Sequence, residues 1–331
     1  MIAHAVVFTK RNVVEFRKVE CPEPGSNDAI IRVTHSWISN GTEGSFLRGE
    51  RIKGETAYRA GDPDPFPIVA GYQKIGVVES VGSQIKDLTP GETVFCIAGR
   101  VSNMFRPHGG HVSPSVTPRQ FIWKLPPNAE PLAYAGLVLT QVGYNCGSRA
   151  PINPDDWAVV IGDGQVGQWS AQTLAARRCR VIVVGHRKSR LELAQRLTGC
   201  HVINSKEVDW APAVHSLTNG TLALGVDTVG SLRITETLIS LLRHCGHIVS
   251  AGFCGTNDQI SLQAFRDLEL SLDAVTGMTR PRMDATIAMI SNGELKTLPL
   301  ITQHFPVAKA AEAWRLIESH DPTVLGVILD W

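Results

Sequence analysis

The chain has 331 residues, of which 43% are hydrophobic and 19% are charged, as in an ordinary globular protein. The net charge of +1, with no basic stripe carrying interleaved aromatic residues, argues against a nucleic-acid-binding protein. No apolar run is long enough to span a membrane, and the N-terminus lacks the cationic region of a signal peptide. The seven scattered cysteines form no Cys-x-x-Cys pair, so we expect reduced thiols in a cytoplasmic protein. The length of the chain predicts two domains.

Residues 1 to about 125 have the pattern of β-structure throughout. Short runs rich in β-branched residues alternate with turn clusters such as Pro22-Glu-Pro-Gly-Ser-Asn27. The expected strands are 5–9, 13–19, 29–35, 75–81, 93–98 and 121–125. Such a series of short strands predicts a small barrel.

From residue 150 to about 275, strands and helices alternate. The expected strands are 158–161, 181–184, 201–203, 225–229, 247–251 and 272–276. The expected helices are 166–178, 189–198, 232–243 and, from a weaker pattern, 208–217. This alternation predicts a doubly wound parallel sheet. The tail returns to a mixed pattern, with an amphipathic helix at 306–317 and a closing strand at 323–329.

A glycine-rich turn follows the first strand of the second half. Gly162, Gly164 and Gly167 have the G-x-G-x-x-G spacing, which serves a tight turn, close approach to phosphate and close helix packing. The helix that follows directs its N–H groups and positive dipole end toward phosphate, so Gln165 and Val166 are expected beside a pyrophosphate. A purely structural turn is the alternative, but the flanking strand and helix favour a dinucleotide.

The second strand of this half ends at Gly185, where an NAD site usually has an acidic residue for the ribose 2′-hydroxyl. A carboxylate would repel a 2′-phosphate, whereas glycine leaves room for one. Arg187 and Arg190 follow with guanidinium groups that suit phosphate, and His186 lies beside them. We therefore expect NADP(H), with Gly252 as a further cofactor residue; a solvated basic turn is the alternative.

Several motifs occur in a familiar order along the chain. They are Asn40-Gly-Thr-Glu43, Pro67-Ile-Val-Ala-Gly-Tyr-Gln-Lys-Ile-Gly-Val-Val78, Leu88-Thr-Pro-Gly-Glu-Thr-Val94, the Gly162 turn and Leu224-Gly-Val-Asp-Thr-Val-Gly230. Over essentially its whole length the chain resembles the medium-chain dehydrogenase/reductase superfamily. The run Val184-Gly-His-Arg187 also resembles the Gly-Ser-Arg of NADP-preferring members.

The resemblance implies an α/β fold with two domains and a substrate cleft between them. Residues 1–125 and 295–331 would form a GroES-like β-barrel catalytic domain. Residues 126–294 would form a Rossmann NADP-binding domain with a doubly wound, six-stranded parallel sheet. The resemblance further implies a homodimer or a homotetramer.

The chain departs from the superfamily at the positions that bind catalytic zinc. Zinc-dependent members have Cys-Gly-Thr-Asp where this chain has Asn40-Gly-Thr-Glu43, and Gly-His-Glu where it has Gly71-Tyr-Gln73. The third ligand falls near Val138, and the four-cysteine lobe is missing. Amide, phenol and alkyl groups do not replace the thiolate and imidazole ligands of zinc, so we expect no metal. A site rebuilt from His108 and His111 on a loose glycine loop is the alternative.

Without a metal, other groups must serve the oxygen of the reacting carbonyl. Thr42 matches the hydroxyl that relays the substrate proton, and Tyr72 takes the place of a metal ligand, where its phenol would act as general acid and base. Asn40 would orient the oxygen, and Glu43 would hold Tyr72 or a water. His111 is a further catalytic candidate. The alternatives are that Tyr72 is a core aromatic residue and that His111 is solvated or structural.

The segment 46–63, between the two catalytic motifs, is polar and cationic. It carries Arg48, Arg51, Lys53, Tyr58 and Arg59. Such a lining suits a small polyhydroxylated or anionic substrate, with a solvated surface loop as the alternative.

We therefore expect an NADP-dependent, zinc-independent enzyme that interconverts a polar secondary alcohol, of sugar, polyol or cyclitol type, and its ketone. The bacteriochlorophyllide hydroxyethyl dehydrogenases, which oxidise a secondary alcohol, form a similar zinc-less branch. A quinone or enoyl double-bond reductase and a non-catalytic NADPH-binding protein are the other functions left open. Neither nucleic acid nor membrane is an expected partner.

Overall fold

The computed structural model describes residues 1–54, 56–254 and 259–331, which form two compact units. Unit 1 comprises Met1–Val138 and Thr297–Trp331, and unit 2 comprises Leu139–Lys296. The first boundary lies beyond the expected position at residue 125. The reason is that the short helix η2 (Pro131–Tyr134) contacts strands β7 (Gln73–Val81) and β8 (Thr93–Ile97) of unit 1.

Unit 2 contains a parallel sheet of six strands in the order β16-β15-β14-β17-β18-β19. Counted along the chain from β14, this is the order 3-2-1-4-5-6 of a doubly wound dinucleotide-binding sheet, which confirms the prediction. The strands are β14 (Trp157–Ile161), β15 (Arg180–Gly185), β16 (His201–Asn204), β17 (Leu222–Asp227), β18 (Leu242–Ser250) and β19 (Ser271–Ala274).

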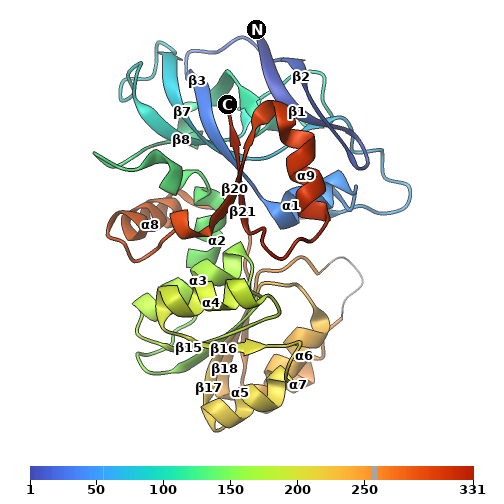
Figure 1. The fold of residues 1–331 in the computed structure, drawn as a ribbon, viewed down its shortest axis with the longest axis vertical. Helices are drawn as coiled ribbons and strands as arrows, with labels where there is room; N and C mark the ends of the chain where they lie inside the picture. Colours follow the sequence, from blue (N-terminus) through green and yellow to red (C-terminus); the bar gives the residue numbers. More distant parts are fainter. Residues whose placement is uncertain (55, 255–258) are drawn as a thin grey trace. The chain divides into compact units, whose positions relative to one another are not determined.

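Helices cover both faces of this sheet (Figure 1). Along β14, Ala158 and Val160 pack with α2, α3 and α4, whereas Val159 and Ile161 pack with α5, α6 and α7. Both faces are therefore apolar, which is why these strands are near-continuous hydrophobic runs in the sequence. The helices of the unit are α2 (Leu137–Ser148), α3 (Gln165–Ala176), α4 (Lys188–Thr198), α5 (Trp210–Thr218), α6 (Leu232–Leu241), α7 (Leu262–Asp267) and α8 (Arg280–Ser291).

Unit 1 is built mainly from antiparallel strands. One sheet has the order β10-β9-β12-β3-β7-β8-β13 with β20 and β21 joined to it, and the other has the order β11-β1-β2 with β6 beside β1. All six expected strands of this half are present. The remaining strands are β1 (Ile2–Lys10), β2 (Val13–Glu20), β3 (Asp28–Ile38), β4 (Arg51–Lys53), β5 (Thr56–Ala57), β6 (Ile68–Val69), β9 (Gly99–Arg100), β10 (His108–Gly109), β11 (Val112–Ser113), β12 (Ser115–Pro118), β13 (Ile122–Lys124), β20 (Ile301–Pro306) and β21 (Gly326–Asp330).

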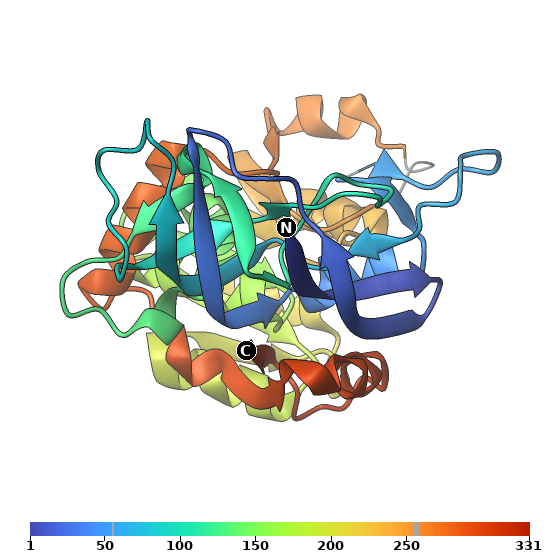
Figure 2. The ribbon, with the colours of Figure 1, turned by 90° about the horizontal axis from the view of Figure 1, so that it is seen from above.

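The C-terminal return completes unit 1. Strand β21 pairs with β3, and Leu329 lies opposite Ser36. The expected amphipathic helix forms as α9 (Ala310–Glu318), which starts later than predicted because Pro306 still belongs to β20. Both chain ends therefore belong to this unit, and Figure 2 marks them with N and C.

The first half of the chain is not entirely β-structure, because Asn40–Leu47 forms helix α1. Two glycines make this segment a poor helix former in isolation. The carboxylate of Glu43 accepts a hydrogen bond from the N–H of Ser39, at the start of the helix. Phe46 and Leu47 then pack in one buried cluster with Trp314 of α9, so tertiary contacts stabilise the helix.

Candidate active site

The glycine turn of unit 2 has the geometry expected of a phosphate-binding loop. Gly162 has φ +117°, a conformation that favours glycine, and a Cβ on Gly167 would lie 2.0 Å from the carbonyl oxygen of Gly162. A Cβ on Gly164 would meet no described atom within 4 Å, so the turn is open at this residue. Gln165 and Val166 form the first turn of α3, whose N-terminal end suits an anion.

A buried carboxylate occupies the space beside the end of β15. Oδ2 of Asp163 accepts hydrogen bonds from the backbone N–H groups of His186 and Arg187, both at 2.8 Å. A Cβ on Gly185 would lie 2.5 Å from the Asp163 side chain. The expected open room beside Gly185 is therefore filled by Asp163. Arg190 lies 3.5 Å from this carboxylate, so its guanidinium stabilises the turn.

Positive charge gathers around the same strand end. Nη1 of Arg187 lies 2.8 Å from Nε2 of His186. Burial lowers the pKa of His186, and the positive charges of Arg187, Lys206 and Arg190 lower it further, against the opposing effect of Asp163. No motif in the sequence singled out Lys206. It follows β16, whose Asn204 is paired with Gly185, so its position is a consequence of the strand order.

The ends of β14, β17 and β18 meet at this edge of the sheet. Thr228 donates a hydrogen bond from its hydroxyl to the carbonyl oxygen of Ile161 at 2.9 Å. A Cβ on Gly252 would lie 1.9 Å from the backbone nitrogen of Gly230. Gly252 thus allows two strand ends to approach closely beside the Gly162 turn.

The predicted catalytic residues of unit 1 lie on one helix and on a pair of hydrogen-bonded backbone segments beside it. Asn40, Thr42 and Glu43 lie on α1. Tyr72 and His111 lie on adjacent backbone segments, which hydrogen bonds join: the N–H of His111 donates to Ala70 at 2.8 Å and the N–H of Gly110 to Gly71 at 2.7 Å. Tyr72 and Thr42 are both half-buried.

His111 and Glu43 bind each other inside unit 1. His111 is fully buried, with Nδ1 at 2.8 Å from the Ser36 hydroxyl and Nε2 at 2.9 Å from Oε2 of Glu43. Both ring nitrogens are therefore engaged with protein groups. Lys74 donates a hydrogen bond to the carbonyl oxygen of Gly110, which further fixes this segment. The geometry favours a positioning role for His111, on a segment that is ordered by hydrogen bonds rather than loose.

Asn40 offers an acceptor with no protein partner. Its Nδ2 donates a hydrogen bond to the carbonyl oxygen of Leu325 at 2.9 Å. Because a carbonyl only accepts, the amide must present its nitrogen there and its oxygen elsewhere. That Oδ1 atom is buried without a hydrogen-bond partner among the described residues, and such an acceptor suits a hydroxyl group of a ligand.

Arg106 is a second residue that the sequence analysis missed. Its guanidinium lies over the ring of Phe46, 4.0 Å from the ring centre. Burial lowers the pKa of Arg106 to about 10, against the opposing charge of Glu43. In the part of the chain that the structure describes, Arg106 has neither an ion pair nor a hydrogen bond, and its Nε is buried. Its only sequence signal was its position two residues before His108.

Other positive charge lies near Arg106. Burial lowers the pKa of His108, and the charges of Arg106 and Lys53 lower it further. By contrast, two cations of the 46–63 segment are already paired, since Arg48 binds Glu318 and buried Arg51 donates to Ser45. Hydrogen bonds to Glu50 and to Glu318 raise the pKa of Arg48. Residue 55 of this segment lies outside the described residues.

The three positions that correspond to zinc ligands do not suit zinc. Asn40, Tyr72 and Val138 present an amide, a phenol and an alkyl group, whereas zinc prefers thiolate, imidazole and carboxylate. The alternative pair, His108 and His111, lacks a third ligand: within the described ranges, no group of three histidine, cysteine or acidic side chains lies here.

Comparisons with known proteins agree with this fold. Residues 166–292 match a family model described as zinc-binding dehydrogenase. The chain is 27% identical to 2-desacetyl-2-hydroxyethyl bacteriochlorophyllide A dehydrogenase of Cereibacter sphaeroides, over 99% of this chain and 98% of that protein. It is 23% identical to L-galactonate-5-dehydrogenase of Escherichia coli, over 95% of each chain.

A solved structure covers both units. The Escherichia coli oxidoreductase of unknown specificity involved in membrane biogenesis has a TM-score of 0.86 at 19% identity, over 100% of this chain and 99% of that one. These findings support the medium-chain dehydrogenase/reductase superfamily. They also support a nicotinamide-dependent oxidoreductase of alcohols and ketones, with a GroES-like unit and a Rossmann unit. The match to the zinc-binding family model lies within unit 2, and positions 40, 72 and 138 lie outside it. No described helix is long and apolar enough to span a membrane.

Proposed function

We propose that the protein is an NADP-dependent, zinc-independent dehydrogenase that interconverts a polar secondary alcohol and its ketone. The observation that carries this proposal is the open Gly162 turn of a doubly wound sheet, with a cationic group of side chains at the end of the neighbouring strand β15. A glycine turn at a helix N-terminus binds pyrophosphate, and cations beside the second strand suit a 2′-phosphate.

Different residues of unit 2 would contact different parts of the cofactor. Gly162, Gly164 and Gly167 shape the turn, with Gln165 and Val166 at the pyrophosphate. His186, Arg187 and Lys206 would hold the 2′-phosphate, while Arg190 keeps Asp163 in place. The bound nicotinamide supplies or accepts the hydride. The carboxylate of Asp163 is satisfied by two N–H groups and lies close to Arg190, so it opposes a phosphate less than a free carboxylate would.

The residues of unit 1 would serve the oxygen of the substrate. The Tyr72 phenol donates a proton to this oxygen during reduction and accepts one during oxidation. Asn40 presents Oδ1 to the substrate hydroxyl, and Thr42 relays the proton. Glu43 acts at a distance: it binds His111 and the start of α1, and it thereby positions Asn40 and Thr42. No metal is needed to hold the oxygen in this arrangement.

The cations near α1 favour a substrate that carries a carboxylate in addition to hydroxyl groups. Arg106 is partly desolvated and has no carboxylate partner in the described chain, and Lys53 lies near enough to His108 to lower its pKa. A substrate carboxylate would offset the cost of this buried charge. A relative with a similar span acts, by its name, on the sugar acid L-galactonate. We propose a sugar acid, or its keto acid, as the preferred substrate.

We further propose that the chain is a homo-oligomer, a homodimer or a homotetramer. Strand β19 lies at the end of the parallel sheet, and its Leu272 is 43% exposed. Unpaired sheet edges with exposed apolar side chains favour pairing with another chain.

A substrate panel tests the proposed function. NADPH oxidation is measured with keto acids derived from sugar acids, with neutral ketoses and with quinones, and in parallel with NADH. The keto acids should react best, with NADPH preferred. In Arg106→Gln, KM for the keto acids should rise about tenfold or more while the neutral ketoses change little, as for loss of a charged contact. The exposed Arg32→Gln, on β3 of the same unit, is the matched control. Turnover with quinones alone, or NADPH binding without any turnover, would contradict the proposal.

A further inference from the structure

A second group of metal-binding side chains lies in unit 2, on a bulge of β18. Leu222 and Leu224 of β17 pair with Leu242 and His247 of β18, so residues 243–246 protrude from the strand. His244 and Cys245 lie on this bulge. Glu269 lies just before β19. It is close to the bulge because the N–H of Cys245 donates a hydrogen bond to the carbonyl oxygen of the preceding residue, Leu268, at 2.8 Å.

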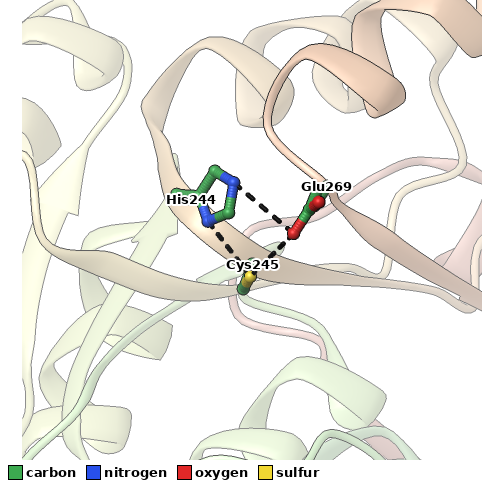
Figure 3. A group of neighbouring side chains, drawn as sticks. All are labelled: His244, Cys245 and Glu269. Carbon is green, nitrogen blue, oxygen red and sulfur yellow. Dashed lines mark hydrogen bonds and ion pairs between the residues drawn. The ribbon is translucent and has the colours of Figure 1, made fainter.

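The three side chains point toward one another, as Figure 3 shows. Sγ of Cys245 lies 3.1 Å from Nδ1 of His244 and 3.6 Å from Oε2 of Glu269, and Nε2 of His244 lies 3.5 Å from the same oxygen. Ligands of a tetrahedral zinc, with bonds of about 2.0–2.3 Å, stand about 3.3–3.6 Å apart. An ion takes only one nitrogen of His244, so the two distances from that ring do not belong to the same set of ligands. With one ligand atom from each residue, the three atoms still lie within 4.8 Å of one another, and side-chain rotation would bring them to the spacing of a metal site.

We propose that His244, Cys245 and Glu269 bind one zinc ion, with water in the fourth position. Thiolate, imidazole and carboxylate are the three ligand types that zinc takes from proteins. All three residues are exposed, so an ion reaches them without opening the fold. In the described part of the chain, no other group of three such side chains has this spacing.

The site lies away from the proposed cofactor turn. The Gly162 turn follows the C-terminal end of β14, whereas the bulge lies near the beginning of β18, and the strands of this sheet are parallel. The two sites therefore lie at opposite edges of the sheet. A zinc ion here would join the β18 bulge to the segment before β19 without taking part in the chemistry, and the proposal does not depend on the proposed function.

Cobalt substitution tests the site in the intact protein. After chelation, Co²⁺ is added alone, and the thiolate-to-cobalt absorption and the tetrahedral d–d bands are followed. We expect one Co²⁺ per chain, displaced by one Zn²⁺. Cys245→Ser should abolish the thiolate band, and His244→Asn and Glu269→Gln should each weaken binding about tenfold or more. Cys179→Ser removes a thiol elsewhere in unit 2 and should leave the spectrum unchanged.

Two results of the cobalt experiment would contradict the proposed site. Absence of the thiolate band at stoichiometric Co²⁺ would overturn the proposal, and so would a band that persists in Cys245→Ser, because the ion would then lie elsewhere. Thermal unfolding gives an independent measure, since a ligand that binds only the folded state raises the melting temperature. Zinc should raise it in the wild type and in Cys179→Ser but not in Cys245→Ser. Dehydrogenase activity should be equal in all four variants.

Discussion

At the scale of single residues, the sequence predicts groups whose partners are near in the chain. The Gly162 turn and Arg187 belong to one strand–turn–helix–strand segment, so spacing alone placed them together. The pairing of His111 with Glu43 spans 68 residues, and Arg106 meets Phe46 across a comparable separation. Nothing in local sequence encodes such contacts. A buried histidine between two polar side chains therefore appeared in the sequence as a catalytic candidate on a glycine loop, with a solvated or structural role as the alternative.

Arg187→Ala tests the assignment of the cofactor at this scale. The guanidinium should contribute a charge-assisted bond to the 2′-phosphate, worth about 1.5–3 kcal/mol, or roughly a 10- to 100-fold change in affinity. Titration of the protein with NADPH and NADH should show weaker binding of NADPH alone. Arg196→Ala, on the last turn of α4, is the control and should change neither. Equal loss for both cofactors would refute the role in 2′-phosphate binding.

Tyr72→Phe tests the proton donor. General acid–base help is worth about 10²- to 10⁴-fold, so kcat for ketone reduction should fall by at least about 10² while NADPH binding stays unchanged. The shape of the ring is kept, so packing should be preserved. A decrease of only a few fold would instead assign the proton transfer to Thr42 or to water, and Thr42→Val would then show the large loss.

At the scale of elements, a strand or helix could be predicted where its burial leaves a local hydrophobic pattern in the sequence. The strands of unit 2 are apolar on both faces and appear as continuous hydrophobic runs, so their type and order followed from the sequence. Helix α1 did not, because Gly41 and Gly44 disfavour a helix locally and the stabilising contacts with α9 come from the far end of the chain. The two-residue strands β9, β10 and β11 were too short to leave a pattern.

The buried Lys74 of β7 makes one element sensitive to pH. Burial lowers its pKa to about 8 from an ordinary value of 10.5. Between these two pH values the unfolded chain holds a proton on Lys74 that the folded chain has lost, so Lys74 makes the free energy of unfolding rise with pH. Below pH 8 the lysine is charged in both states, and burial of its charge then destabilises the folded state most. Relative to Lys74→Met, the wild type should therefore gain about 2 kcal/mol in unfolding free energy between pH 7 and 9.5.

Urea unfolding of both proteins across this range measures the difference. Burial raises the pKa of Cys96 to about 11 although the charge of Lys74 lowers it, so folded Cys96 keeps its proton over this range in both proteins and its contribution to the difference cancels. Lys86→Met is the control, since Lys86 is exposed, and its difference from the wild type should not vary with pH. A constant difference for Lys74→Met would show that Lys74 stays charged when buried.

At the scale of the whole molecule, two units carry two halves of one proposed reaction. The order of motifs along the chain predicted both the antiparallel unit and the doubly wound unit, and the structure and the comparisons confirm them. The departures at positions 40, 72 and 138 gave the hypothesis of chemistry without zinc. The same chain carries a proposed zinc site on the β18 bulge, which the sequence did not suggest because its ligands lie 24 residues apart and meet only through the pairing of β18 with β19.

The central claim is that side chains of unit 1, and not a metal ion, bind the oxygen of the substrate and transfer its proton. The most direct test measures NADPH-dependent keto-acid reduction by the Cys245→Ser protein after exhaustive chelation, alongside its metal content. Cys245→Ser removes the proposed surface site, so any remaining zinc would belong to the reaction. We predict full activity with no detectable transition metal. Activity that disappears on chelation and returns with Zn²⁺ would contradict the account.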